Sequence, residues 1–387
     1  MKKHKVKTLI LVDTFSIYGF HEMFNAAFLF VVLNNTRDNI VYIADYTAIA
    51  SIKRILKEDD NFSNFLSRIT FKEQKLVKGN TFYEIFFRLL IGAFLNSYYL
   101  MKYQSSKIIF NSLNPISASF MRFLISKRNL PVYIVCHGEL SYPTLNKGWK
   151  SPIYWYGKML KPFLTDPLPE NMKLFLLGNS ILSNVETAYP AIAPNLIAIN
   201  HPFIFTKASL SSNSTINDIK CFGWVGVVSE AKGFLLFNEI TKYFYNNFPE
   251  KFSPYIVGRH NLDEDNYPHL NFISKRSEFV DRVLFDDAVG KLDFILFFYD
   301  NEQYKFTASG AVFDAIQYGK IIIALKNNYF EEIFNKCGEI GVLCNNMLEI
   351  QDVIEGFLTN KISCDKFYIN LRKAKEYYDY NQQIIHI

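Results

Sequence analysis

The feature that most constrains the fold is an alternation of short apolar runs with longer helix-like segments. The runs are rich in Ile, Val, Leu and Tyr and are apolar on both faces, as expected of parallel strands covered by helices. Such alternation implies right-handed crossovers and a doubly wound α/β domain. In the first half the predicted strands are 8–13, 39–45, 107–111, 131–136, 173–178 and 196–200, and the helices lie near 21–34, 47–58, 81–103, 117–128 and 179–189.

A polar, Ser- and Asn-rich stretch interrupts this pattern, which then starts again. We predict an N-terminal domain (1–205), a linker (206–217) and a C-terminal domain (218–387), with the last helix, about 366–381, as a candidate to pack back on the N-terminal domain. Two such domains place a crevice between the carboxyl ends of both sheets, where these sheets bind ligands. The second set of predicted strands is 219–224, 255–257, 270–273, 293–298, 321–325 and 341–344, with helices near 233–247, 276–290, 310–318, 328–336 and 347–358.

Several classes of protein are disfavoured by what the sequence lacks. No apolar stretch reaches the roughly 18 residues of a spanning helix, and the short N-terminal run lacks the long core and cleavage site of a secretory signal. The five cysteines form no CxxC pair, which indicates buried thiols in a reducing compartment. Walker, zinc and nucleophile-elbow motifs are also absent, and we expect a cytoplasmic protein without a nucleic-acid partner.

Charge is unevenly distributed along the chain. Residues 1–205 carry 23 Lys and Arg against 13 Asp and Glu, whereas residues 206–387 carry 19 against 24. The apolar segment 81–103 lies in the basic half and contains Glu84, Arg88 and Lys102. It is either a core helix of the first domain or an interfacial helix that rests on an anionic membrane surface.

The segment 307–324 follows a predicted strand and carries Ser309-Gly310 at the start of a short helix. Helix N-termini hold phosphate, and a glycine there lets a diphosphate approach. Asp314 falls one turn later, where a carboxylate accepts hydrogen bonds from ribose hydroxyls. The alternative is an ordinary strand–loop–helix unit in which Ser309 is the N-cap.

A second glycine-containing loop precedes this segment by about 80 residues. The predicted strand 219–224 leads into a loop that contains Gly226, and Lys232-Gly233 begins the next helix. A lysine at this place can point toward a phosphate in the crevice. Together the two loops, in this order, indicate a nucleotide site more strongly than either does alone.

These two loops resemble the donor-binding half of glycosyltransferase family 4 and related bacterial polysaccharide transferases, over roughly 219–345. The resemblance implies a GT-B fold of two Rossmann-like domains and a nucleotide-sugar donor held without a metal ion. It implies that Lys232 contacts the donor diphosphate. Asp314 stands where the family has the second of two glutamates, and Phe306 stands at the first, so Glu302 is a candidate substitute. Val227 replaces a basic residue of the family pattern.

The N-terminal half carries candidates for the sugar end of the reaction. His137 and Glu139 follow a predicted buried strand, and each is a candidate base. In similar transferases a histidine at this point contacts the donor sugar or the acceptor, while a purely structural loop histidine is the alternative. Gly19, after the first strand, is a candidate for the acceptor-binding loop or a simple turn glycine, and His201 is interpreted as structural.

The spacing of Asp263 and Asp265 is that of a metal–diphosphate motif, but their loop is polar and we interpret it as a solvated acidic loop. The sequence therefore predicts a glycosyltransferase that uses a nucleotide sugar and a saccharide or lipid-linked saccharide acceptor in surface polysaccharide biosynthesis, at the inner face of the cell membrane if peripheral. The alternatives are a sugar-nucleotide epimerase on the same fold and a non-catalytic scaffold of a polysaccharide assembly complex.

Overall fold

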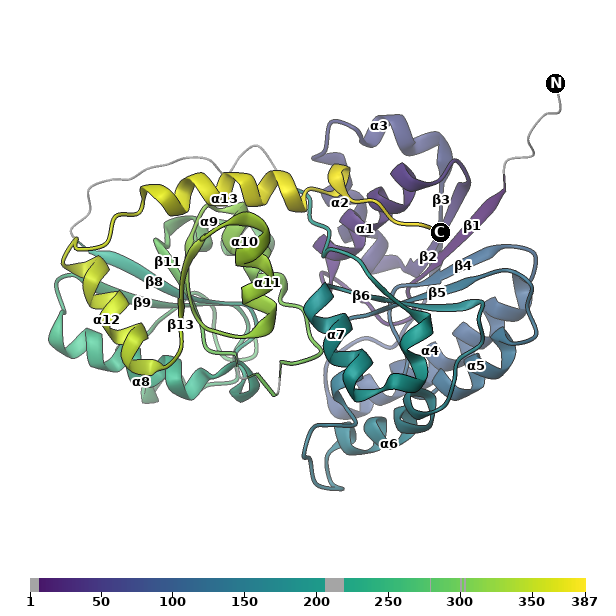
Figure 1. Ribbon diagram of the computed structural model, residues 1–387, viewed down its shortest axis with the longest axis horizontal. Coiled ribbons are helices and arrows are strands. Elements are labelled where there is room, and N and C mark those ends of the chain that lie inside the picture. Colours follow the sequence, from purple (N-terminus) through teal and green to yellow (C-terminus); the bar gives the residue numbers. More distant parts are fainter. Residues whose placement is uncertain (1–6, 206–218, 279, 300, 303) are drawn as a thin grey trace. The chain divides into compact units, whose positions relative to one another are not determined.

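The computed structural model describes residues 7–205, 219–278, 280–299, 301–302 and 304–387. The chain forms two compact units (Figure 1). The first contains the described residues up to Ile204 together with Phe306–Ala308 and Tyr378–Ile387, and the second contains the rest. The predicted linker at 206–217 lies outside the described residues.

The first unit is built on a seven-stranded parallel sheet with the strand order β3-β2-β1-β4-β5-β6-β7. Its strands are β1 (Thr8–Val12), β2 (Asn39–Asp45), β3 (Ile69–Gln74), β4 (Lys107–Phe110), β5 (Val132–Cys136), β6 (Met172–Leu176) and β7 (Leu196–Ala198). Its helices are α1 (Glu22–Asn35), α2 (Tyr46–Lys57), α3 (Phe62–Phe65), α4 (Phe82–Lys102), α5 (Ala118–Ile125), α6 (Pro152–Thr165) and α7 (Asn179–Ala188).

The order of strands determines which helices share a face of this sheet. The chain steps from β1 outward to β3 and then returns to β4, so right-handed crossovers place α1 and α2 on one face and α4, α5 and α6 on the other. Figure 1 shows this division, with α4–α6 below the sheet. Helix α1 is buried on almost all sides, and Tyr380, which follows the last helix, stacks on its Phe30 at 4.6 Å between ring centroids.

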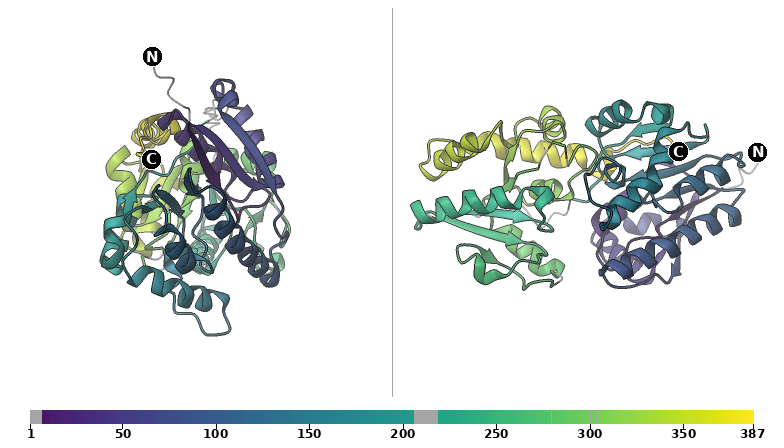
Figure 2. Two further views of the ribbon diagram at one scale, coloured as in Figure 1. Left: turned by 90° about the vertical axis from the view of Figure 1, so that its right-hand side faces the viewer. Right: turned by 90° about the horizontal axis from the view of Figure 1, so that it is seen from below.

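The second unit repeats the architecture with a six-stranded parallel sheet in the order β10-β9-β8-β11-β12-β13. Its strands are β8 (Lys220–Val225), β9 (Phe252–Val257), β10 (Asn271–Phe272), β11 (Phe294–Phe297), β12 (Ile321–Leu325) and β13 (Gly341–Cys344). Its helices are α8 (Phe234–Asn247), α9 (Arg282–Lys291), α10 (Gly310–Gln317), α11 (Asn328–Cys337), α12 (Met347–Leu358) and α13 (Asp365–Tyr378). Figure 2 shows helices on both sides of each sheet. Two doubly wound α/β sheets were predicted, and this fold class is confirmed.

One strand and two helices of the first unit were missing from the sequence prediction, namely β3, α6 and the four-residue helix α3. Strand β3 is an edge strand that is half exposed and contains Lys72 and Glu73, so it lacks the apolar run by which the other strands were recognised. Helix α6 contains Pro162, and a proline inside a segment argues against a helix there when only the sequence is considered. No helix in the described ranges combines the length and the apolar character needed to cross a bilayer, and all five cysteines are free thiols.

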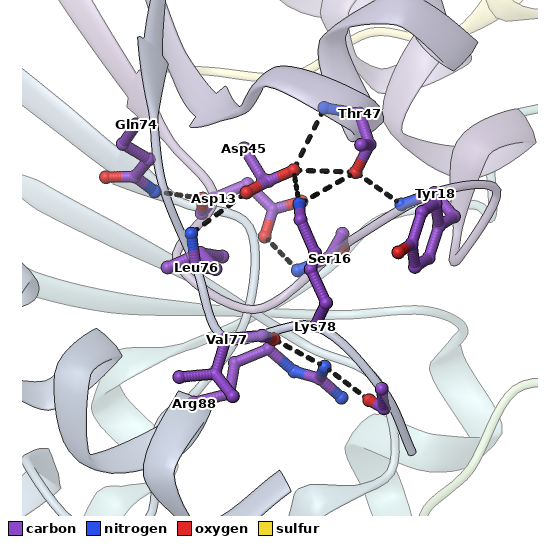
Figure 3. Close-up of polar contacts among 11 residues, drawn as sticks. Asp13, Ser16, Tyr18, Asp45, Thr47, Gln74, Leu76, Val77, Lys78 and Arg88 are labelled. Atoms are coloured by element: carbon purple, nitrogen blue, oxygen red, sulfur yellow. Dashed lines mark hydrogen bonds and ion pairs between the residues drawn. The ribbon is translucent and has the colours of Figure 1, made fainter. Parts of the chain in front are cut away.

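A buried polar network joins the carboxyl ends of β1 and β2 to the loop that follows β3 (Figure 3). The Asp45 carboxylate is fully buried and accepts hydrogen bonds from the backbone N–H groups of Thr47 (2.9 Å) and Leu76 (2.9 Å), and it pairs with the Lys78 ammonium. Burial alone raises the pKa of Asp45, but the hydrogen bonds from Lys78, Thr47 and Leu76 outweigh it, so the pKa is lowered. The network thus fastens the β3–α4 loop to the sheet.

We expect Asp45→Asn to lower the free energy of unfolding by about 3 kcal/mol at pH 7, because it leaves Lys78 without its buried counter-ion. The folded-state pKa of Asp45 is depressed, so its contribution is present above the unfolded-state pKa and disappears as the pH falls below about 4. Denaturant unfolding at several pH values measures the difference in unfolding free energy between the wild type and Asp45→Asn. This difference should become smaller in acid. Asp287→Asn, which removes the exposed pair with Lys291, should change stability by less than about 0.5 kcal/mol.

Candidate functional site

In the second unit, the loop after β8 meets the first turn of α10. Gly226 has a positive φ of 95°, and a Cβ placed on it would lie 3.6 Å from the Lys232 ammonium and 4.0 Å from the Cβ of Ala311. Lys232 ends the short 3-10 helix Glu230–Lys232 that leads into α8. The structure therefore brings Gly226 and Lys232 together with the start of α10, although 80 residues separate them in sequence.

The Lys232 ammonium is partly withdrawn from water in this position. Burial lowers its pKa to about 8, and the negative charge of Asp314 partly opposes that shift. The ammonium also lies 6.0 Å from the centroid of the Tyr299 ring. A partly dehydrated cation beside a helix N-terminus is suited to bind an anion, because both contribute positive potential at the same place.

Gly233 and Gly310, which lie in the two predicted phosphate-binding loops, are glycine for different physical reasons. Gly233 has a φ of 80°, and a Cβ on it would lie 2.4 Å from the carbonyl oxygen of Phe298, so the fold itself requires glycine. Gly310 has neither constraint, since its φ is ordinary and a Cβ would meet nothing within 4 Å. The absent side chain at Gly310 leaves open space over the first turn of α10, which is what a bound diphosphate needs.

The side chain of Ser309 does not cap α10, which was the structural alternative considered from the sequence. Ser309 occupies the N-cap position of α10, but its side chain makes no capping hydrogen bond. Its hydroxyl is buried and lies 2.9 Å from the hydroxyl of Tyr299. Ser309 therefore contributes to the packing of the loop, and its side chain does not occupy the N–H groups of the first turn.

Asp314 is held by a residue that sequence reasoning missed. Arg282, at the start of α9, places its Nη2 3.6 Å from an Asp314 carboxylate oxygen and its Nε 2.8 Å from Asp286. Nothing in the sequence pairs residues 282 and 314, because the contact joins two helices. The Asp314 side chain is only 15% exposed, so its carboxylate has a defined direction.

The other residues that were compared with the glycosyltransferase family pattern are Glu302, Val227 and Phe306. Glu302 is in the loop before α10 with a side chain that is 83% exposed and 4.0 Å from the Lys305 ammonium. Val227 is exposed, whereas Phe306 is buried and packs against Tyr189 in the first unit, with 6.0 Å between ring centroids. Phe306 is therefore a core residue in place of a carboxylate.

In the first unit, His137 follows β5 and its ring is fixed by the backbone. Its Nε2 lies 2.8 Å from the carbonyl oxygen of Asn111. A carbonyl oxygen can only accept, so in the neutral ring Nε2 carries the proton and Nδ1 carries the lone pair. One oxygen of Glu139 accepts hydrogen bonds from the backbone N–H groups of His137 (2.8 Å) and Gly138 (3.1 Å). Glu139 thus shapes the loop that carries His137.

The loop after β1 lies alongside His137. His21 places its ring 4.5 Å from the His137 ring, and Gly19 is two residues away from it. Tyr18 and His21 both have positive φ angles, 51° and 55°, although neither is glycine. Such strain is held in place by the surroundings and concentrates at functional loops. The sequence pointed to Gly19, but it gave no sign of His21.

His201, which we had interpreted as structural, is buried in the same region. Phe24 lies between it and His137, at 5.1 Å and 4.6 Å between ring centroids. Burial and the neighbouring His137 lower the pKa of His201 to about 3, so it is neutral near pH 7. His201 therefore behaves as a core residue of this cluster.

The acidic loop at 263–265 forms no metal centre with its neighbours. Glu264 accepts a hydrogen bond from the backbone N–H of Arg276 (3.0 Å), and Asp263 and Asp265 are exposed. Throughout the part of the chain that the structure describes, no group of three or more His, Cys, Asp or Glu side chains is arranged to hold a metal ion.

Neither a family model nor a curated protein matches the sequence. Solved structures do match over nearly the whole chain. HepE from Anabaena, solved with UDP-glucose, is 13% identical over 97% of this chain and 96% of its own, with a TM-score of 0.59. WaaG, a glycosyltransferase of lipopolysaccharide biosynthesis, is 12% identical over 96% and 95%, with a TM-score of 0.58. A glycosyltransferase from Rickettsia africae is 12% identical over 98% and 96%, with a TM-score of 0.57.

These matches define the class of structure. The chain has the GT-B fold, with two Rossmann-like domains, and in this it resembles bacterial polysaccharide-biosynthesis glycosyltransferases. The fold predicted from the two glycine-containing loops is confirmed. At this level of sequence identity the matches establish the fold, and the chemistry has to be argued from the residues above.

Gly310→Ala tests whether the space over α10 is a ligand site. The fold should tolerate the methyl group, but binding of a nucleoside diphosphate should weaken by about 1–3 kcal/mol, because the methyl occupies the ligand's place. Titration calorimetry with a panel of nucleoside diphosphates measures this. Gly290→Ala in α9 is a matched control, since a Cβ there also meets nothing within 4 Å, and it should leave binding unchanged. Equal affinities for both variants would remove Gly310 from the site.

Lys232 should make diphosphate binding depend on pH. Its pKa is about 8 without ligand, so the ammonium loses its charge above that pH and the affinity should fall roughly tenfold between pH 7 and pH 9. Lys232→Arg stays protonated and should bind with little pH dependence. Lys232→Ala should lose about 1.5–3 kcal/mol at pH 7. A flat wild-type profile would show that Lys232 does not contact the ligand.

Proposed function

We propose that the protein is a glycosyltransferase that moves a sugar from a nucleotide-sugar donor to a saccharide or lipid-linked saccharide acceptor in surface polysaccharide biosynthesis. The observation that carries this proposal is the open first turn of α10 beside the Lys232 ammonium, where a Cβ on Gly310 would meet nothing within 4 Å. The match to HepE, which was solved with UDP-glucose, supports a nucleotide sugar as the ligand class.

The donor end would work through charge. The first-turn N–H groups of α10 and the Lys232 ammonium would hold the diphosphate and stabilise the negative charge that develops on it as the sugar leaves. Arg282 would keep the Asp314 carboxylate in place to accept hydrogen bonds from the ribose hydroxyls. Because these groups supply the positive potential, the proposed reaction uses no metal ion.

The sugar end would use His137. Its Nδ1 lone pair can accept the proton of an acceptor hydroxyl, because the Asn111 carbonyl keeps the other ring nitrogen protonated. Glu139 is the weaker candidate for the base, since one of its oxygens already accepts two backbone hydrogen bonds. The strained loop that contains Gly19 would contribute to acceptor binding.

A non-catalytic nucleotide-sugar-binding protein is the second candidate. The observation in its favour is Phe306, which is buried in the core where the resembling family has a sugar-contacting carboxylate. The same assay tests both functions, because a binding protein would bind the nucleotide sugar without releasing its sugar.

We expect the wild-type protein to release free sugar slowly from one member of a panel of nucleotide sugars. His137→Ala should lower this turnover about 100-fold or more while nucleotide affinity stays within about twofold, because a general base contributes 10²–10⁴ to the rate. Glu139→Gln should lower turnover less. The exposed substitution Asp287→Asn is the control. Normal turnover in a folded His137→Ala protein would exclude it as the base, and binding without turnover in the wild type would favour the second candidate.

We also propose that the protein works as a peripheral protein at the cytoplasmic face of the membrane, where lipid-linked acceptors are held. The basic N-terminal half supports this location.

A further inference from the structure

Helix α4 exposes an unusually apolar side for a surface helix. Of its nine exposed residues, eight are large and apolar or aromatic, and the ninth is Lys102. The eight are Phe82, Tyr83, Phe87, Leu90, Ile91, Phe94, Tyr98 and Met101. A surface helix normally directs such residues to the core and polar residues to water. Helix α4 therefore packs into the first unit through one side and directs its other, strongly apolar side outward.

The inward side of α4 buries Leu89, Tyr99 and Leu100, and it also carries polar residues that make specific hydrogen bonds. Arg88 is buried and donates hydrogen bonds to the carbonyl oxygens of Val77 (3.0 Å) and Gly79 (2.9 Å), which Figure 3 shows. Asn96 accepts a hydrogen bond from the Thr14 hydroxyl (2.9 Å). Turning the helix to bury its apolar side would leave these groups unpaired, so the outward apolar stripe is fixed by the fold.

The apolar stripe continues onto the neighbouring helices. Helices α5 and α6 pack beside α4 in that order on the same face of the sheet. Phe120 and Phe123 of α5 are exposed, as are Trp155 and Met159 of α6. Trp149, just before α6, is 67% exposed. We call the exposed residues of α4, α5 and α6, with Trp149, the aromatic face.

Basic residues accompany the aromatic face. Residues 81–166 contain ten Lys and Arg and three Asp and Glu, so the positive charge of the N-terminal half is concentrated here. Several ammonium groups lie over aromatic rings of this region: Lys102 over Tyr98, Lys127 over Phe123, Lys150 over Trp149 and Lys158 over Tyr154, all between 5.1 and 5.7 Å from the ring centroid. Mixed tryptophan, tyrosine, phenylalanine and lysine side chains are typical of the boundary between lipid headgroups and acyl chains.

We propose that the aromatic face docks onto an anionic lipid bilayer, with α4 lying in the plane of the interface. The aromatic and aliphatic side chains would enter the headgroup and upper acyl region, and the ammonium groups would contact lipid phosphates. This rests on the proposed function in one respect only, namely that the acceptor is lipid-linked. The charge of the face selects a membrane over an apolar protein partner, because cytoplasmic leaflets carry negative charge.

The test is co-sedimentation of the full chain with vesicles of phosphatidylglycerol and phosphatidylcholine, compared with vesicles of phosphatidylcholine alone. The wild type should sediment with the anionic vesicles and should be released at least partly by high salt. Phe94→Glu, at a side chain that is 72% exposed, should lower the partition coefficient at least tenfold. Leu348→Glu on α12 of the second unit, where the side chain is 73% exposed, is the matched control and should bind as the wild type does.

A second variant tests the charges separately. Lys158→Glu combined with Lys161→Glu changes only exposed side chains and should lower binding to anionic vesicles at least tenfold and reduce its salt dependence. Thermal unfolding and nucleotide binding should be unchanged in both variants, which shows that they are folded.

Three outcomes would overturn the docking proposal. These are wild-type protein that sediments with no vesicles, variants that sediment as the wild type does, and a wild-type dimer that Phe94→Glu converts to monomer without any vesicle binding, which would assign the face to a second copy of the chain. Vesicle binding without any nucleotide-sugar binding would instead uphold the docking face and contradict the proposed function.

Discussion

Parallel pairing of the strands is the constraint on which the rest of this structure depends. In a parallel sheet every strand ends at the same edge, so the loops that follow β1, β2 and β5 in the first unit gather at one edge. The loops that follow β8 and β11 gather in the same way in the second unit. His137 and the strained loop around Gly19 come together for this reason, and so do Lys232 and the start of α10.

The glycines of the two loops in the second unit are there for different physical reasons. Gly233 and Gly226 adopt positive φ angles that shape the loop, whereas a Cβ placed on Gly310 would meet no atom of the described residues within 4 Å. Glycines that one sequence motif groups together can therefore be required by different physical constraints. Of the three glycines in these two loops, Gly310 has neither a positive φ nor a close neighbour to require it, so it is the one that most directly indicates a ligand.

The two sides of α4 have different roles. The inner side packs into the fold, and the outer side belongs to the proposed docking surface. The inner side fastens the β3–α4 loop through Arg88, near the place where Asp45 and Lys78 fasten the same loop to β2. The inner side also buries Leu89, Tyr99 and Leu100, but most of the large apolar and aromatic residues of α4 face outward. The arrangement gives the first unit an aromatic and basic surface.

The sequence by itself determined the fold class, because strands buried on both faces must be apolar throughout and separated by covering helices. It also singled out Lys232, Gly310, Asp314 and His137 as candidate site residues, since each follows a recognisable strand. Edge strand β3 was not predicted from the sequence because it is half exposed. Only the tertiary structure decided that Arg282 holds Asp314, that His21 lies beside His137, and that the apolar side of α4 faces outward. Those facts depend on contacts between elements far apart in sequence and on which way a helix is turned, and neither is encoded in a local pattern of residues.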